Sequence, residues 1–319
     1  MTLKLVLMGT GEFAAPTFSA LAEGGHEVVA LVTQPSRSGP GHHDHANALK
    51  EEFLARNIPV WQPADASAPE SLDLLAAAEA DLFVVAAYGQ ILKPGLLALP
   101  RLGAINVHAS LLPRHRGASP IHHAILAGDD ETGITIFRIE PRVDTGPVLG
   151  RVTTRIGTRE TSGDLHDRLA LLAVDLAETV VDELAEGTAR PQVQDEVLAT
   201  RAPRLKKADA AVDWSVDAAA IDRRIRAMQP WPNPFTFLHS ADEPPRRLIV
   251  VDVAAGPPDV SGPPGLVLQA GESGIVVGCG DGSAVITRLQ PEGRRVMDAG
   301  EFLRGTVVHN GDRMGPIGA

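Results

Sequence analysis

The sequence has little cysteine, no long apolar run and no excess of basic residues, and each shortage excludes a class of protein. Its single cysteine, Cys279, cannot form an intramolecular disulfide, which excludes a disulfide scaffold and favours a reducing compartment. No stretch approaches the roughly 20 apolar residues of a membrane-spanning helix, and residues 1–8 lack the basic and apolar regions of a signal peptide. We therefore expect a cytoplasmic protein without a membrane partner. The net charge of -11 argues against a protein that coats nucleic acid.

The sequence does contain enough apolar material for a large core. Its 319 residues, 44% of them hydrophobic, are typical of about two domains. Apolar strands alternate with helical segments through the first half, and this predicts an α/β fold with a Rossmann-like, mostly parallel sheet and helices on both faces. The predicted strands are residues 3–8, 26–33, 59–61, 82–87 and 105–108, with 133–139 at the margin of the sheet. The predicted helices are residues 13–21, 47–56, 71–79, 119–127 and 165–184.

The last third of the chain has a different pattern. Short valine-rich strands, separated by Gly and Pro, follow a helix at 218–228 and predict a small β-barrel-like domain. We expect a first domain over 1–188, a linker over 189–205 and a second domain over 206–319. The acidic excess lies entirely within the first 200 residues, so the second domain is the better candidate to meet a polyanion.

The first predicted turn, Gly9–Ala14, fits the glycine fingerprint of dinucleotide-binding proteins. The acidic residue that would hold a ribose after the second strand is missing, because that strand ends at Thr33-Gln34-Pro35. Arg37 keeps open a site for a 2′-phosphate and hence an NADP-dependent oxidoreductase. The alternative is that this strand-to-helix turn needs its glycines only for tight geometry.

Three histidines at 42, 43 and 45 suggest a metal site. They are adjacent in a loop with glycine and proline, cannot easily converge on one ion, and have no second cluster at ligand spacing. We therefore expect no metal.

The most informative residues are Asn106, His108 and Asp144. Asn106 and His108 are two apart on a predicted strand and so point the same way, while Asp144 lies in a turn that ends with Gly146. An amide and an imidazole are able to donate to an oxyanion, and a carboxylate is able to hold the imidazole in its charged form. Because no Ser or Cys nucleophile belongs to this set, it favours direct attack by a substrate amine. The alternative is that Asn106 caps a turn and His108 is a satisfied core histidine.

These residues belong to longer motifs. Residues 106–117 read Asn-x-His-x-Ser-Leu-Leu-Pro-x-x-Arg-Gly, and Asp144-Thr145-Gly146 follows. In these two motifs the chain resembles the folate-dependent formyltransferases. Four other segments support the resemblance: Gly9–Ala14, 32–35 (Val-Thr-Gln-Pro), 87–89 (Ala-Tyr-Gly) and 131–135 (Glu-Thr-Gly-Ile-Thr). The motifs 213–215 (Asp-Trp-Ser) and 225–232 (Ile-Arg-Ala-Met-Gln-Pro-Trp-Pro) resemble the members that act on methionyl-tRNA, so the similarity extends over both predicted domains.

The resemblance implies a formyl donor, 10-formyltetrahydrofolate, and an acceptor, the α-amine of initiator methionyl-tRNA. It implies that Asn106, His108 and Asp144 are catalytic, and that the second domain is an OB-like barrel that helps to bind the tRNA. The resemblance together with the chemistry of a pterin ring implies a folate site lined by Ser110, Leu111, Leu112, Pro113, Leu92 and Val143. We expect a monomer.

In this family the loop after the second strand usually carries Arg and Lys residues that reach the tRNA. Here the loop, residues 36–45, offers only Arg37 as a firm cation, with His42 as a weaker candidate. We expect part of the phosphate contact to shift to other basic residues: Arg204, Lys206, Lys207, Arg223, Arg224 and Arg226. A solvated helix face without function is the alternative for these residues.

Other functions stay open on the sequence alone. The same chemistry is compatible with an amino-sugar nucleotide or glycinamide ribonucleotide as acceptor, or with hydrolysis of formyltetrahydrofolate. An NADP-dependent oxidoreductase and a non-catalytic RNA-binding module are the alternatives from other classes.

Overall fold

The computed structural model describes residues 1–35, 48–241 and 243–317. These residues form two compact units. The first, here the N-terminal unit, consists of Met1–Pro120, Glu131–Arg155 and Leu165–Pro203; the second, here the C-terminal unit, consists of Ile121–Asp130, Ile156–Asp164 and Arg204–Ala319. Two excursions of the chain between positions 121 and 164 therefore belong to the C-terminal unit.

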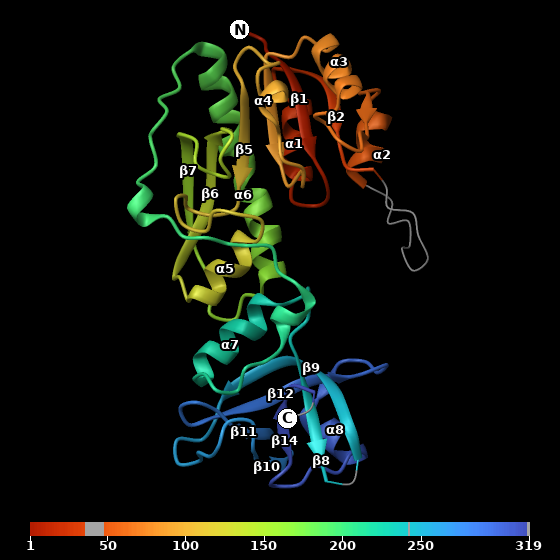
Figure 1. The fold of residues 1–319 in the computed structure, drawn as a ribbon, viewed down its shortest axis with the longest axis vertical. Helices are drawn as coiled ribbons and strands as arrows, with labels where there is room; N and C mark the ends of the chain where they lie inside the picture. Colours follow the sequence, from red (N-terminus) through yellow and green to blue (C-terminus); the bar gives the residue numbers. More distant parts are fainter. Residues whose placement is uncertain (36–47, 242, 318–319) are drawn as a thin grey trace. The chain divides into compact units, whose positions relative to one another are not determined.

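The N-terminal unit is built on a seven-stranded sheet of order β3-β2-β1-β4-β5-β6-β7 (Figure 1). The first five strands in this order are parallel to one another. β6 runs antiparallel to β5, and β7 runs antiparallel to β6. The strands are β1 (Lys4–Gly9), β2 (Glu27–Val32), β3 (Val60–Trp61), β4 (Leu82–Ala86), β5 (Ala104–His108), β6 (Glu131–Arg138) and β7 (Val148–Arg155). All five residues of the central strand β4 are buried, as expected of a parallel strand that is covered on both faces.

Helices cover both faces of this sheet, which confirms the predicted fold class. On one face, Leu75 of α3 and Leu96 of α4 pack in a cluster with Met8, Phe83 and Val85. On the other face, Leu176 and Val180 of α6 pack over Gly150 of β7, and Phe18 of α1 packs over Gly9 of β1. The helices of this unit are α1 (Ala15–Glu23), α2 (Ala48–Ala55), α3 (Pro69–Ala77), α4 (Pro94–Leu97) and most of α6 (Ser162–Glu186); α5 (Pro120–Ala127), apart from its first residue, belongs to the C-terminal unit.

One feature of the predicted sheet is wrong. Residues 133–139 were expected at the margin, but β7 lies outside β6 and forms the edge. The sequence of β7 alternates Arg151, Thr153 and Arg155 on its exposed side with only partly buried residues between them. Charged residues are typical of an edge strand because they oppose pairing with another chain, and they weaken the hydrophobic pattern.

The C-terminal unit is an antiparallel sheet of order β10-β11-β12-β9-β8-β14 (Figure 1). Backbone hydrogen bonds from Val267 N to Asp312 O and from Met314 N to Gly265 O connect its first and last strands, so the sheet closes. The result is the OB-like barrel that the sequence predicts. Its elements are η2 (Lys207–Ala210), α7 (Ala218–Ala227), β8 (Phe235–Ser240), β9 (Glu243–Ala255), β10 (Val267–Gly271), β11 (Gly274–Gly278), β12 (Ser283–Pro291), β13 (Met297–Asp298), α8 (Ala299–Gly305) and β14 (Arg313–Gly315).

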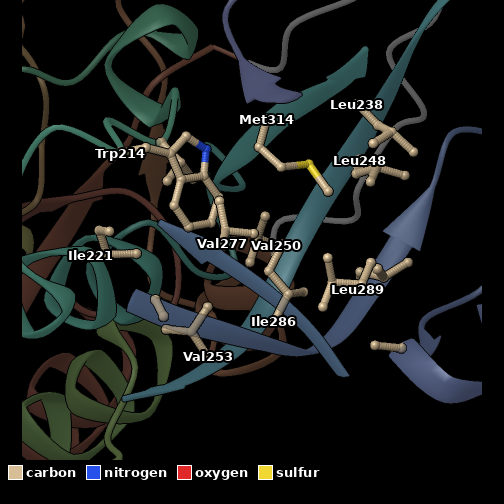
Figure 2. Packing of buried hydrophobic residues seen from close by; sticks show 14 of the residues in the cluster. Trp214, Ile221, Leu238, Leu248, Val250, Val253, Val277, Ile286, Leu289 and Met314 are labelled. Atoms are coloured by element: carbon tan, nitrogen blue, oxygen red, sulfur yellow. The ribbon is translucent and has the colours of Figure 1, made fainter. Parts of the chain in front are cut away.

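The core of this unit joins the barrel to α7. Ile221 and Ile225 of α7 pack in one cluster with strand residues such as Val250 and Ile286, and Trp214 closes one side (Figure 2). The indole of Trp214 also donates a 3.1 Å hydrogen bond to the Thr236 hydroxyl, so its polar atom is satisfied in the core. Each fully buried Ile, Val or Leu side chain in this cluster contributes about 1.5–3 kcal/mol to stability relative to an exposed one.

Candidate functional site

The site begins on β5, the last parallel strand, which carries Asn106 and His108. Asn106 is paired with Val85 of β4 and with Phe137 of β6, and His108 is paired with Thr135 of β6. Asn106 is half-buried, whereas His108 is 5% exposed. Their spacing places both side chains on the same face of the strand.

Both ring nitrogens of His108 face oxygen atoms. Nε2 lies 3.0 Å from the carbonyl oxygen of His115 and donates to it, because a carbonyl only accepts. Nδ1 lies 3.8 Å from Oδ2 of Asp144, close enough for Coulomb attraction and too far for a direct hydrogen bond. The edge of the ring packs against Phe137 at a centroid distance of 6.2 Å.

Asp144 is distant from His108 in the sequence, yet its side chain lies beside the imidazole. Asp144 comes from the turn between β6 and β7, where its backbone has φ 54. Its side chain is 13% exposed, and Oδ2 accepts a 2.7 Å hydrogen bond from the backbone N–H of Gly117. The carboxylate thus faces inward, toward the imidazole, and is held by the loop that follows β5.

Gly117 is required by this loop for two reasons. Its φ is 130, in a region that side chains rarely adopt, and an added Cβ would lie 2.4 Å from the carbonyl oxygen of Ala202. The sequence motif contains this glycine, but only the structure explains it.

Thr135 is a second residue that the sequence analysis did not single out for the site. It is fully buried, its hydroxyl donates to the carbonyl of Ser110 at 2.7 Å, and it accepts from the N–H of Leu112 at 3.1 Å. It therefore fixes the start of the loop after β5. Its signal in the sequence was its place at the end of the motif 131–135, where it pairs with His108 of β5.

The residues expected at a folate site lie around this loop, although not all of their side chains face outward. Ser110 and Leu112 are buried: the Ser110 hydroxyl donates to the carbonyl of Arg114 at 2.7 Å, and Leu112 packs with Phe137 and Val148. Leu111 is half-buried and Pro113 is buried. Val143, next to Asp144, is 60% exposed.

Leu92 lies after β4, in a buried cluster that also contains Tyr88. Burial, and secondarily the charge of Asp65, raise the pKa of Tyr88 to about 12, so its hydroxyl stays protonated at neutral pH. Among the residues that the structure describes, this hydroxyl has no hydrogen-bond partner.

The glycine turn after β1 is explained by packing. A Cβ at Gly9 would lie 2.5 Å from the carbonyl oxygen of Ala86 and 2.7 Å from the ring of Phe18. The helix and β4 approach so closely that only glycine fits at this position. This geometry supports the tight-turn interpretation and removes the need for a bound dinucleotide.

The basic residues expected at a nucleic acid differ in how exposed they are. Arg204, Lys206 and Lys207 are exposed in the C-terminal unit. By contrast, Arg226 is 13% exposed, pairs with Asp222 at 2.8 Å and donates to the Glu160 carbonyl.

Arg223 is half-buried against Gly128, and its Nε has no hydrogen-bond partner among the described residues. Arg37 and His42 lie outside the described residues, as do the two histidines beside His42. Within the described ranges, no group of three His, Cys, Asp or Glu residues is arranged to hold a metal ion, and no helix has the length and apolarity to span a membrane.

Comparison with known proteins defines the class. Residues 3–181 match the family model described as formyl transferase, and residues 204–307 match the model of the formyl transferase C-terminal domain. The protein is thus a formyl-group transferase built from both parts of that family, and the oxidoreductase and purely RNA-binding alternatives are excluded.

Full-length relatives then identify the branch. A methionyl-tRNA formyltransferase of Citrifermentans bemidjiense is 43% identical over 98% of this chain and 96% of the relative. One from Stutzerimonas stutzeri is 44% identical over 94% of each chain. The chain belongs to the methionyl-tRNA formyltransferase family.

Solved structures share the fold at low identity. WlaRD, a sugar 3N-formyl transferase solved in the presence of dTDP and 5-N-formyl-THF, has a TM-score of 0.65 at 14% identity and covers 92% of this chain and all of its own. HypX from Aquifex aeolicus in complex with tetrahydrofolic acid has a TM-score of 0.59 at 16% identity and covers 94% of this chain. The chain spans about half the length of HypX.

Proposed function

We propose that this protein transfers the formyl group of 10-formyltetrahydrofolate to the α-amine of initiator methionyl-tRNA. The observation that carries the proposal is the inward-facing pair of His108 Nδ1 and Asp144 Oδ2, 3.8 Å apart, with Asn106 on the same face of β5 as His108. The names of the full-length relatives specify the acceptor.

The reaction needs no covalent intermediate with the protein. The neutral amine forms a bond to the formyl carbon, and the carbonyl electrons move onto oxygen. Collapse of this intermediate breaks the bond between the carbon and the folate nitrogen, which takes up a proton. The amine loses its proton to the carboxylate of Asp144 directly or through water.

Asn106 and His108 stabilise the oxyanion in this proposal. The Asn106 amide donates one hydrogen bond. Because His115 accepts from Nε2 of His108, the proton on Nδ1 is the one that donates to the reacting oxygen. The 3.8 Å gap to Asp144 leaves that proton uncommitted to the carboxylate.

The folate is held mainly by backbone groups. The side chains of Ser110 and Leu112 are committed inside the molecule. We infer that peptide groups of 110–113 and 143–144 other than those bonded to Thr135 and Gln194 face the cosubstrate, with Leu92 and Val143 supplying apolar contact. A pterin ring is flat and rich in donors and acceptors, which suits a site lined by peptide groups.

The tRNA is contacted by exposed basic residues of the C-terminal unit. Arg204, Lys206 and Lys207 suit this role, since their charges are available to phosphates. Arg226 is bonded inside the molecule and instead holds segment 156–164 to α7. In this scheme residues 1–188 carry out catalysis, residues 189–205 connect the two domains, and residues 206–319 bind tRNA. The protein acts as a monomer in the cytoplasm, where charged tRNA is used.

The decisive experiment offers the purified protein 10-formyltetrahydrofolate with one of three acceptors: initiator methionyl-tRNA, glycinamide ribonucleotide or an amino-sugar nucleotide. We expect formyl incorporation into methionyl-tRNA, and none when the methionine amine is blocked by acetylation. Transfer only to another acceptor, or release of formate without any acceptor, would contradict the proposal.

A further inference from the structure

A buried glutamine, Gln194, connects the two loops that form the candidate site. It is 5% exposed and lies in the chain segment after α6. Its Nε2 donates to the carbonyl oxygens of Asp144, at 2.9 Å, and Gly146, at 2.8 Å. The turn that carries the carboxylate of Asp144 is therefore held at two of its peptide groups by one side chain.

The other end of the same amide binds Arg116. Oε1 of Gln194 accepts from Nε of Arg116 at 3.2 Å and from Nη2 at 2.8 Å. The chemistry fixes the amide orientation, because carbonyls require a donor and a guanidinium requires an acceptor. Arg116 is itself anchored by Glu196, with contacts of 2.9 and 3.0 Å.

Arg116 belongs to the loop that contacts both catalytic side chains. The preceding residue, His115, supplies the carbonyl that binds Nε2 of His108. The following residue, Gly117, donates its N–H to Asp144. Arg116 and Gln194 thus connect the loop whose His115 carbonyl binds the His108 imidazole with the turn that carries the Asp144 carboxylate.

We propose that Gln194 is a positioning residue for formyl transfer, which sets the Asp144 carboxylate against His108 through its bonds to the Asp144 turn and to Arg116. This role rests on the proposed function, since it concerns the same site. Asp144 is in the left-handed region at φ 54, so its turn needs support from outside to keep one geometry. A displacement of about 1 Å of a reacting group is enough to lower a rate by about a hundredfold.

The test compares Gln194→Ala with Gln192→Ala. Gln192 is the matched control, since it is the same residue type two positions earlier, its side chain is exposed, and its backbone bonds to Val148 survive the change. We expect Gln194→Ala to lower kcat by about 10- to 100-fold with KM for 10-formyltetrahydrofolate changed less than threefold. Gln192→Ala should match the wild type.

A second variant, Gln194→Glu, separates the two ends of the side chain. It keeps an acceptor for Arg116 and removes both donors to the carbonyls of the Asp144 turn. We expect its kcat to fall at least as far as that of Gln194→Ala. A wild-type kcat in either variant, or a loss confined to KM, would overturn the assignment.

The double variant Gln194→Ala/Asp144→Asn distinguishes positioning from general stability. If Gln194 acts through Asp144, removing it from a protein that already lacks the carboxylate should cost less than threefold more in kcat. Losses that multiply would overturn the proposal.

Amide hydrogen exchange gives a readout that does not depend on turnover: Gln194→Ala should speed exchange at Gly117 and over 143–147, and Gln192→Ala should not. Unchanged exchange would also overturn the proposal. Faster exchange, together with a wild type that fails to formylate methionyl-tRNA, would leave the positioning role intact and reject the proposed function.

Discussion

Asp144 is the residue on which the proposed chemistry depends most directly. Its backbone conformation allows a substitution that removes its charge without disturbing the turn. Asn tolerates the left-handed conformation that Asp144 adopts, and its side-chain oxygen still accepts from the N–H of Gly117. The change Asp144→Asn therefore removes the charge and leaves the turn intact.

We predict that Asp144→Asn lowers kcat by at least a hundredfold, which corresponds to about 2.7 kcal/mol of barrier. The reason is that the negative charge 3.8 Å from Nδ1 of His108 is removed, and the attacking amine loses its proton acceptor. Steady-state kinetics and equilibrium binding of folate measure the two effects separately, and folate affinity should change little. A turnover near that of the wild type would end the role assigned to Asp144.

Among the individual site residues, spacing along the sequence predicted the relation between Asn106 and His108 but not the position of Asp144. Asn106 and His108 share one face of β5 because side chains alternate along a strand, so two residues of the set were predictable from a local rule. That Asp144 faces His108 followed from no local rule, because the turn after β6 is brought there by sheet pairing. The sequence motif spans His115 and Gly117, but their roles depend on backbone atoms, so the motif did not reveal them.

At the scale of elements, the short helix η2 carries the exposed lysines of the C-terminal unit. Lys206 precedes the helix, and its backbone N–H, not its side chain, is bonded to Asp209 at 2.6 Å. Replacing Lys206 and Lys207 by alanine therefore removes two charges and leaves the cap of η2 in place.

We predict that Lys206→Ala/Lys207→Ala weakens tRNA binding and flattens the dependence of log K on log salt by about 1 to 2. Formyl transfer at saturating tRNA should be unaffected. Filter binding over a series of salt concentrations measures the slope, with Lys4→Ala, at the start of β1, as the control lysine. A slope equal to that of the control would exclude these lysines from the interface.

Elements were predicted well where burial enforced a strict pattern and less well at edges. The buried strands β1, β4 and β5 and the amphipathic helices α6 and α7 lie close to their predicted positions. The edge strand β7 was missed because solvent allows charged residues on it. The segment 189–205 reads as a linker from its composition, yet Gln192 and Ala202 pair with β7 and with the loop after β5.

At the scale of the whole molecule, stability at low pH depends on carboxylates with internal partners, and Asp81 is a clear case. It accepts from the backbone N–H of Lys4 at 2.9 Å and from Arg101 at 2.8 and 3.0 Å. The bond from Lys4 is the main cause that holds the pKa of Asp81 below its ordinary value of 3.8; Arg101 adds to it, and partial burial opposes it.

The direction of the pH effect follows from that lowered pKa. The folded state binds the proton less readily than the unfolded state, so the stability from Asp81 is complete above pH 3.8 and is lost as pH falls through the folded pKa.

We predict that Asp81→Asn lowers the free energy of unfolding at pH 7 by about 1 kcal/mol, and that the difference from the wild type shrinks below pH 3.8. Urea unfolding at pH 7, 5 and 3 measures it. A difference that stays constant over this range would show that the charge of Asp81 plays no part.

The sequence by itself determined the fold class, the core strands, the barrel and the identity of the amide, imidazole and carboxylate, because hydrophobic periodicity and residue chemistry are local properties. Tertiary structure alone decided that Asp144 meets His108, that Gln194 and Arg116 join their loops, and that Arg226 is bonded internally. These facts depend on sheet order and on backbone groups brought together from distant parts of the chain. No spacing along the sequence encodes them.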